Sequence, residues 1–275
     1  MSNYITEKTK LHFIKAESTA VPVINYSGFD EQQEYSDDYI FQETEVINAR
    51  LANPEKTFSL DKEGFELVSF TPNEIDFLTP ETVKSDYYPQ VESLIKKQTG
   101  ATHVFAFDHT VRRGIKNSNR HPAYHVHNDY THETGPIRAQ SVLDDAVLKL
   151  FAGKRMIQIN VWRSIDGVVE KDPLAFLDFS TLDAEDLVKA KISFNDMHST
   201  DKHQGEIFAL KKNNNQKWYY YPRIDGTEAV LIKGFDSEPS NSRFAMHTAF
   251  PLLGQDDSGK PRQSIETRTY AFFDV

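Results

Sequence analysis

The spacing of hydrophobic residues changes along this chain. Residues 1–60 are mostly polar and acidic, and we expect an arm with short helices there, one of them over Thr44–Asn53. Apolar residues recur at the spacing of one helix face in Pro80–Thr99 and again in Ala139–Phe151. The sequence therefore predicts two amphipathic helices beyond the arm.

Most other apolar segments are short and rich in β-branched and aromatic residues, as strands are. The predicted strands are 65–70, 103–107, 124–129, 156–162, 174–179, 206–210, 217–221, 229–233, 243–250 and 264–273. Because these strands do not alternate regularly with helices, they predict a mostly β fold with flanking helices: a sandwich, a jelly roll or a barrel. We expect a single domain, in which residues 1–60 form an N-terminal arm of the same fold as residues 61–275.

Composition narrows the classes of function. The 275 residues include no cysteine, which excludes a disulfide scaffold, cysteine-ligated metal sites and thiol catalysis. The formal net charge of −10 argues against a nucleic-acid partner. No apolar run approaches the ~18 residues of a membrane span, and the first residues lack the apolar stretch of a signal peptide. We expect a cytoplasmic protein without a membrane partner, and the sequence leaves its oligomeric state open.

The densest group of metal-ligating residues lies in the segment His121–Glu133. Residues two apart on a strand share a face, so His125, His127 and Asp129 can line up. An imidazole and a carboxylate so placed are suited to one divalent cation, and the 2-His-1-carboxylate triad of non-haem iron needs a third ligand from elsewhere. A polar edge strand with solvated histidines would show the same pattern.

Two distal segments bear on this hypothesis. His247 lies in the apolar run Arg243–Phe250, where a histidine is either hydrogen-bonded within the core or a candidate for the missing ligand. At the start of the last predicted strand and just before it, four polar residues alternate onto one face: Arg262, Ser264, Glu266 and Arg268. A buried arginine needs an anion, because an unpaired buried charge is costly. That anion is either a protein carboxylate such as Glu266 or a dicarboxylate co-substrate held by a bidentate contact.

Other patterns remain open at this stage. Gln158, Asn160 and Trp162 share one face of a predicted strand, which suits a cavity lining or a solvated surface equally well. The run from His125 to Glu133 is similar to the cupin metal motif, although the gap between His127 and Glu133 is one residue longer than that motif usually allows.

Five segments together resemble a known family: Phe107–Arg113, Val126–Thr131, Ile159–Arg163, Phe244–Phe250 and Arg262–Arg268. Their order and spacing are similar to those of the non-haem Fe(II)/2-oxoglutarate-dependent oxygenases that include a fungal gibberellin desaturase, fungal meroterpenoid endoperoxide-forming enzymes and a cephamycin-pathway accessory protein. The resemblance covers about residues 60–275, whereas the first 60 residues match no known pattern.

The resemblance implies a double-stranded β-helix (jelly-roll) core that uses Fe(II), 2-oxoglutarate and O₂. It places the iron triad on His127, Asp129 and His247. Arg262 and Ser264 resemble the Arg-x-Ser pair that grips the distal carboxylate of 2-oxoglutarate. Arg268 fits that role nearly as well, and Asn160 is included among the residues expected to bind the co-substrate.

The function implied by the resemblance is hydroxylation or desaturation of an unactivated C–H position, with succinate and CO₂ as co-products. The substrate would be a small metabolite or a natural-product intermediate, and the fold does not choose among the possible oxidations. The alternatives are a cupin-type metalloenzyme that does not use 2-oxoglutarate and a non-catalytic jelly-roll binding or accessory protein.

Overall fold

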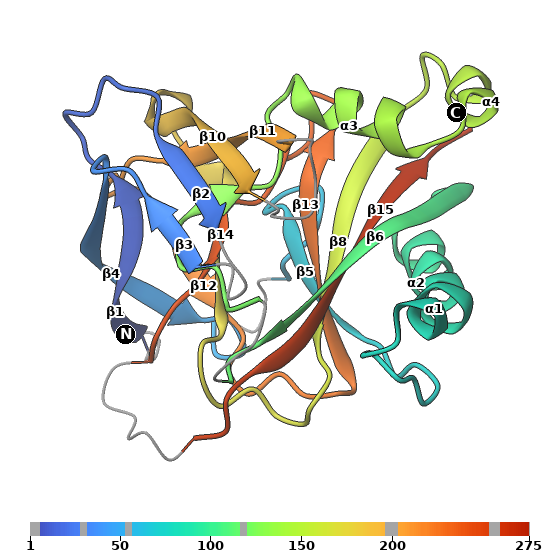
Figure 1. Cartoon of the computed structure of the whole chain (residues 1–275), viewed down its shortest axis with the longest axis horizontal. Helices are drawn as coiled ribbons and strands as arrows, with labels where there is room; N and C mark the ends of the chain where they lie inside the picture. Colours follow the sequence, from blue (N-terminus) through green and yellow to red (C-terminus); the bar gives the residue numbers. More distant parts are fainter. Residues whose placement is uncertain are drawn as a thin grey trace.

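Two twisted β-sheets face each other across the interior of the protein, with helices beside the smaller sheet (Figure 1). A computed structural model describes residues 6–27, 32–52, 57–115, 120–195, 203–252 and 259–274. This mostly β architecture, with curled sheets and few helices, confirms the predicted fold class.

The larger sheet has ten strands and the smaller has five. The order in the ten-stranded sheet is β1 (Thr6–Ile14), β4 (Tyr39–Asn48), β12 (Trp218–Tyr220), β9 (Leu174–Leu177), β14 (His247–Ala249), β7 (His127–Asn128), β11 (His203–Leu210), β10 (Leu187–Asn195), β2 (Val23–Ser27) and β3 (Gln32–Tyr35). The order in the five-stranded sheet is β5 (Phe65–Ser69), β13 (Glu228–Asp236), β8 (Met156–Ser164), β15 (Gln263–Phe272) and β6 (His103–Arg113).

The helical segments are short. They are α1 (Pro80–Thr82), a π-helical turn (Val83–Tyr87), α2 (Tyr88–Thr99), α3 (Thr134–Val142), α4 (Asp145–Leu150) and two 3₁₀ turns (Phe179–Thr181 and Ala184–Asp186). The helix predicted over Pro80–Thr99 is therefore three consecutive pieces, and the one predicted over Ala139–Phe151 is divided between α3 and α4. No helix in the described part of the chain is long and apolar enough to span a membrane.

The two faces of the five-stranded sheet differ in chemistry. On the outer face, residues such as Val161 and Ile265 pack against Val91 and Ile95 of α2. The alternate residues of β8 and β15 point into the space between the sheets. Gln158, Asn160, Trp162, Ser264 and Glu266 are buried there although most are polar, and Arg268 is half-buried. Polar groups buried on the inner face need hydrogen-bond or ion-pair partners in the space between the sheets. The candidate site lies in that space.

The N-terminal residues form strands, so the prediction of a helix over Thr44–Asn53 is wrong; Asn53 itself lies outside the described residues. β1 and β4 pair antiparallel, with Thr6 opposite Ile47 and Ile14 opposite Tyr39. Along β4, Thr44, Val46 and Asn48 are buried while Glu43 and Glu45 are less buried, which is the two-residue period of a strand. The polar face of β4 obscured this period because it carries glutamates, which are good helix formers.

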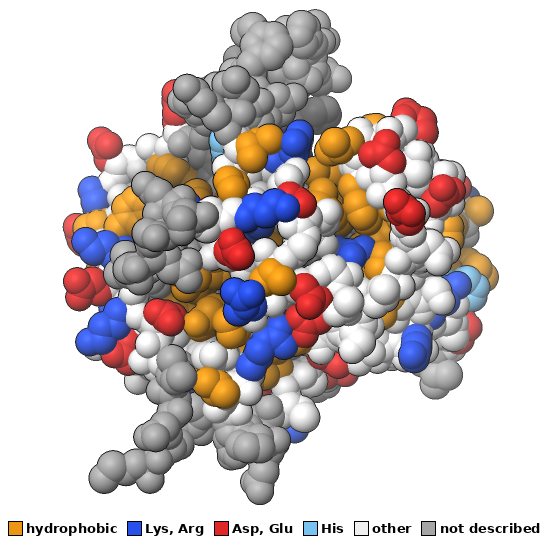
Figure 2. Space-filling model, turned by 90° about the horizontal axis from the view of Figure 1, so that it is seen from below, with side chains coloured by type: hydrophobic (Ala, Val, Ile, Leu, Met, Phe, Trp, Pro, Cys, Tyr) orange, Lys and Arg blue, Asp and Glu red, His pale blue; other side chains and the backbone are white. Residues whose placement is uncertain are grey.

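Surface charge is mixed on the face shown in Figure 2, where basic, acidic and hydrophobic side chains are interspersed. No field of one sign dominates this face. A polyanion such as nucleic acid binds best to a clustered basic surface, and this face does not present one.

An aromatic cluster joins the N-terminal strands to the segment before β7. The ring of His12 stacks on Phe41, with centroids 4.2 Å apart, and lies 4.6 Å from Tyr35. His12 is 6% exposed, and its buried Nδ1 has no hydrogen-bond partner among the described residues. Burial lowers the pKa of His12 to about 4, because the charged imidazolium is disfavoured in these surroundings.

We therefore expect His12 to make metal-free protein less stable in acid. Below its ordinary pKa the unfolded chain takes up a proton that the folded chain does not, so the free energy of unfolding falls as the pH is lowered toward about 4. Between about pH 7 and pH 5 the contribution is about 1–2 kcal/mol. Urea unfolding at both pH values should show a smaller loss in His12→Phe than in the wild type, and equal losses would contradict this assignment.

Candidate metal centre

Three potential metal ligands converge between the sheets. His127 on β7 is directly opposite His247 on β14, with ring centroids 4.5 Å apart, and Asp129 follows β7. One ligand atom from each of the three lies within 4.8 Å of the others, and His127 Nε2 is 3.5 Å from Asp129 Oδ1. The structure thus brings together the three residues that the sequence analysis nominated as a triad.

Backbone carbonyls fix the tautomers of both imidazoles. His127 Nδ1 lies 2.8 Å from the carbonyl oxygen of His125, and His247 Nδ1 lies 3.0 Å from that of Ala245. A carbonyl only accepts, so Nδ1–H donates in each ring and Nε2 keeps its lone pair for a metal. Burial lowers the pKa of His247, which keeps this ring in the neutral form that a metal requires.

The carboxylate of Asp129 is held by two donors on its second oxygen. Asn160 Nδ2 donates to Asp129 Oδ2 over 2.9 Å, and Arg268 Nε donates to the same atom over 3.3 Å. Burial alone would raise the pKa of Asp129, but Arg268 and His127 together bring it well below its usual value. The group is therefore ionised at neutral pH, as a metal ligand must be.

Arg268 is occupied by protein groups. Besides Asp129 it contacts Glu266 Oε1, 2.7 Å from its Nη2, and it donates from Nη1 to Thr110 Oγ1 over 3.0 Å. The structure thus places two residues from the predicted co-substrate set, Arg268 and Asn160, against the carboxylate of Asp129.

Arg262 has a different environment. It lines a small cavity beside the triad, is 3% exposed, and its Nη1 donates to the carbonyl of Asp172. Its guanidinium carbon lies 5.4 Å from the ring centroid of Trp162, and its buried Nε has no partner among the described residues. Burial lowers the pKa of Arg262 to about 10; the carboxylate of Asp172 opposes this shift, and the nearby Arg112 adds to it. Arg262 therefore remains charged at neutral pH.

Arg112 lines the same cavity, although its sequence pattern predicted no role for it at the site. It lies opposite Ser264 where β6 pairs with β15, so the predicted partner of Arg262 lies next to a second arginine. Neither Arg112 nor Arg262 forms an ion pair with any carboxylate in the described part of the chain. The alternation of Asp108, Thr110 and Arg112 on β6 was the sequence signal that these side chains share a face.

The residues that a cupin-type site would use are arranged differently. His125 stacks on His127 with centroids 4.2 Å apart, and its Nδ1 contacts the hydroxyl of Tyr35 at 3.2 Å. Glu133 is exposed and pairs with Lys189 at 3.1 Å. Neither residue belongs to the group of ligand atoms around His127.

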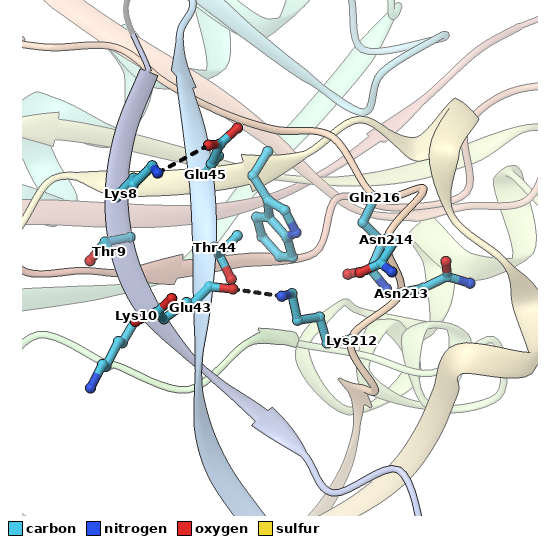
Figure 3. Close-up of a pocket in the computed structure, with 11 residues that line it drawn as sticks. Lys8, Thr9, Lys10, Glu43, Thr44, Glu45, Lys212, Asn213, Asn214 and Gln216 are labelled. Atoms are coloured by element: carbon cyan, nitrogen blue, oxygen red, sulfur yellow. Dashed lines mark hydrogen bonds and ion pairs between the residues drawn. The ribbon is translucent and has the colours of Figure 1, made fainter.

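A larger cavity of about 660 Å³ lies elsewhere, between the β1–β4 pair and residues 212–216 (Figure 3). Two of its three lysines contact the protein itself: Lys8 approaches Glu45 at 3.9 Å, and Lys212 donates to the Glu43 carbonyl over 2.6 Å. The described residues that line it include no histidine. The chemistry of the triad therefore has no counterpart in this cavity.

Known proteins that resemble this chain include enzymes of the kind that a His–Asp–His metal site suggests. A family model described as "Oxidoreductase/YMDC permease-like domain" matches residues 11–272. The α-ketoglutarate-dependent dioxygenase phiK from a fungal species is 31% identical over 236 residues, covering 79% of this chain and 80% of that protein. The hydroxylase/desaturase efuI from Hormonema carpetanum is 29% identical over 252 residues, covering 83% of each chain.

A solved structure shares the whole fold. The iron and α-ketoglutarate-dependent endoperoxidase NvfI superposes with a TM-score of 0.77 at 25% identity, covering 98% of both chains. The chain therefore belongs to the family of Fe(II)/2-oxoglutarate-dependent dioxygenases, in which 2-oxoglutarate is another name for α-ketoglutarate. Fe(II) and 2-oxoglutarate are its cofactor and co-substrate.

Proposed function

We propose that His127, Asp129 and His247 bind the Fe(II), and that Arg262 and Arg112 bind the distal carboxylate of 2-oxoglutarate. Two imidazole Nε2 atoms and one carboxylate oxygen are the donor set that non-haem iron prefers when it must keep open positions. When bound, the iron supplies the chemistry that couples decarboxylation of 2-oxoglutarate to oxidation of a C–H bond.

The observation that carries this proposal is the pair of arginines beside the triad. Arg262 is buried and Arg112 is half-buried, and both face one cavity. Although Asp129 and Glu266 also line this cavity, neither arginine forms an ion pair with a carboxylate among the described residues. Such an arrangement is costly unless an anion completes it. The cavity is lined by both arginines and by all three residues of the triad, so a dicarboxylate with one end on the arginines and the other on the metal would complete it. A guanidinium binds a carboxylate through two parallel hydrogen bonds.

The protein's own groups would orient the reactants and exclude water. The carbonyls of His125 and Ala245 hold the imidazoles in the ligating tautomer. Asn160 and Arg268 hold one oxygen of Asp129, so that the other faces the histidines. The apolar side chains of Trp162 and Leu174 line part of the cavity. Their low polarity would strengthen a contact between Arg262 and a carboxylate.

For the reaction, we propose hydroxylation or desaturation of an unactivated C–H position in a small metabolite or natural-product intermediate. Relatives whose names state a dioxygenase or a hydroxylase/desaturase support this choice. We include a cytoplasmic location in the proposal, since a chain without cysteine needs no oxidising compartment for its folding.

Conversion of 2-oxoglutarate to succinate tests the proposal without knowledge of the substrate. Even without an added substrate, we expect purified protein with Fe(II), 2-oxoglutarate and O₂ to form succinate slowly, above the level of a His127→Ala control. Mass spectrometry of incubations with candidate metabolites should then reveal gain of one oxygen atom or loss of two hydrogens. Equal succinate formation in wild type and His127→Ala would contradict the proposal.

A further inference from the structure

A chain of side-chain amides ends on the carboxylate of Asp129. Gln158 Nε2 donates to Asn160 Oδ1 over 2.6 Å, and Asn160 Nδ2 donates to Asp129 Oδ2 over 2.9 Å. Gln158 is 0% exposed and Asn160 is 1% exposed. The outer member of this chain, Gln158, therefore reaches the predicted metal ligand only through Asn160.

The direction of these hydrogen bonds matters. An amide has a donor end and an acceptor end, and only the donor end of Asn160 suits an ionised carboxylate. With Nδ2 on Asp129, the oxygen of Asn160 must meet a donor, and Gln158 supplies it. Removing that donor would leave Asn160 Oδ1 buried without a partner and would permit the amide to turn its oxygen toward Asp129, where it would repel the carboxylate.

Gln158 occupies this position because the neighbouring strand carries a glycine. The register between β13 and β8 shifts between Lys233 and Phe235, so Gly234 is the extra residue of a bulge beside Gln158. A Cβ on Gly234 would lie 1.9 Å from Gln158 Oε1 and 3.2 Å from Tyr130 Cδ2. Any side chain at this position would therefore displace Gln158.

The same glycine also contacts the segment that carries the ligands. Asn128, between His127 and Asp129, donates from Nδ2 to the carbonyl of Gly234 over 2.9 Å and to the carbonyl of Tyr130 over 2.6 Å. Gly234 therefore affects Asp129 in two ways. Its carbonyl accepts a hydrogen bond from the side chain of Asn128, the residue before Asp129. Its lack of a side chain also leaves the space for Gln158, which reaches Asp129 through Asn160.

We propose that Gln158 and Gly234 are positioning residues for the metal site. They act through Asn160 to hold Oδ2 of Asp129 and to direct Oδ1 toward His127 and His247. This inference rests on the proposed role of Asp129 as an iron ligand. Groups that orient a ligand in this way typically change metal affinity by about 10–100-fold when they are removed.

Two variants test the proposal. Gln158→Met keeps the length and bulk of the side chain but removes its donor, and Gly234→Ala adds the methyl group that collides with Gln158. The matched controls are Gln98→Met, at an exposed amide on α2, and Gly226→Ala, where the nearest atom to an added Cβ is Arg163 Nη2 at 3.6 Å. The readouts are anaerobic Fe(II) affinity, the visible band of the Fe(II)–2-oxoglutarate complex, and the melting temperature of metal-free protein.

We expect Gln158→Met and Gly234→Ala to weaken Fe(II) binding by about 10–100-fold and to shift or weaken the band, while both controls match the wild type. Unchanged Fe(II) affinity and band in folded Gln158→Met would overturn the inference, and this variant decides the matter if Gly234→Ala does not fold. Failure of the proposed function is distinguishable, because then the wild type itself would bind no Fe(II) that depends on His127.

Discussion

His247→Ala is expected to remove tight Fe(II) binding while the protein stays folded. His247 is the only ligand contributed by β14, and its Nε2 is oriented by the Nδ1 contact with the Ala245 carbonyl. Losing one of three protein ligands should cost more affinity than the about 10–100-fold that follows from loss of an orienting group. Anaerobic equilibrium binding of Fe(II) measures the loss, and circular dichroism confirms the fold.

Two other histidines provide the comparison for this variant. His132→Ala is a suitable control, because His132 is exposed and its ring packs against Phe208 and Phe244, away from the triad. His125→Phe retains a ring against His127 and should keep tight binding. A cupin-type site would reverse this result, with affinity lost in the His125 variant and kept in His247→Ala. That reversal would contradict the assignment of the triad.

Arg262→Gln is expected to weaken binding of 2-oxoglutarate to the Fe(II)-loaded protein by about 10²–10³-fold, with Fe(II) affinity unchanged. Removing one partner of a buried charge pair typically costs about 3–5 kcal/mol, and 1.4 kcal/mol corresponds to about tenfold in affinity. Glutamine fills most of the space of arginine but cannot form the bidentate contact. Titration of 2-oxoglutarate under anaerobic conditions, followed by its visible band, gives the affinity.

Arg268→Gln separates the two arginines that the sequence left as alternatives. Arg268 contacts Asp129 and Glu266, so its loss should mainly lower the Fe(II) affinity and the stability of the protein.

Arg112→Gln should weaken binding of 2-oxoglutarate as Arg262→Gln does, but by a smaller factor, because Arg112 is only half-buried and also donates to the His121 carbonyl. A 2-oxoglutarate affinity that is unchanged in Arg262→Gln but lost in Arg268→Gln would contradict these assignments.

The sequence predicts two of the candidate metal ligands, His127 and Asp129, more directly than the third, His247. His127 and Asp129 are two residues apart, so strand geometry alone places them together. His247 lies in a distant apolar segment, and only the pairing of β14 with β7 brings it opposite His127. From the sequence it was a candidate by residue type and by family resemblance, since long-range strand pairing leaves no local signal.

The two candidate arginines show a second limit of prediction from the sequence. In the sequence, Arg262 and Arg268 alternate onto the same predicted face, so the pattern alone does not show which of them binds a ligand. Their partners differ because Arg268 lies opposite Asn160, within reach of Asp129, whereas Arg262 lies just before the first residue of β15, near Arg112 and Trp162. Position along the strand relative to neighbouring strands decides the role, and that information is tertiary.

The N-terminal strands were missed for a related reason. β1 and β4 bury one face and leave charged residues such as Glu43 and Glu45 on the other, so the segment looks polar on average. The strand β10 was also missed, because lysines alternate with its apolar residues. In both cases the alternation was present, but high polarity outweighed it in the prediction.

An anaerobic titration of metal-free protein with Fe(II) and then with 2-oxoglutarate, monitored in the visible range, tests the assignment of the iron site most directly. We predict a charge-transfer band from the chelated keto acid that saturates at one equivalent per chain in the wild type and is absent in His127→Ala. Fe(II) binding without such a band, or a band that persists in His127→Ala, would contradict the assignment of this triad as the iron site of a 2-oxoglutarate-dependent dioxygenase.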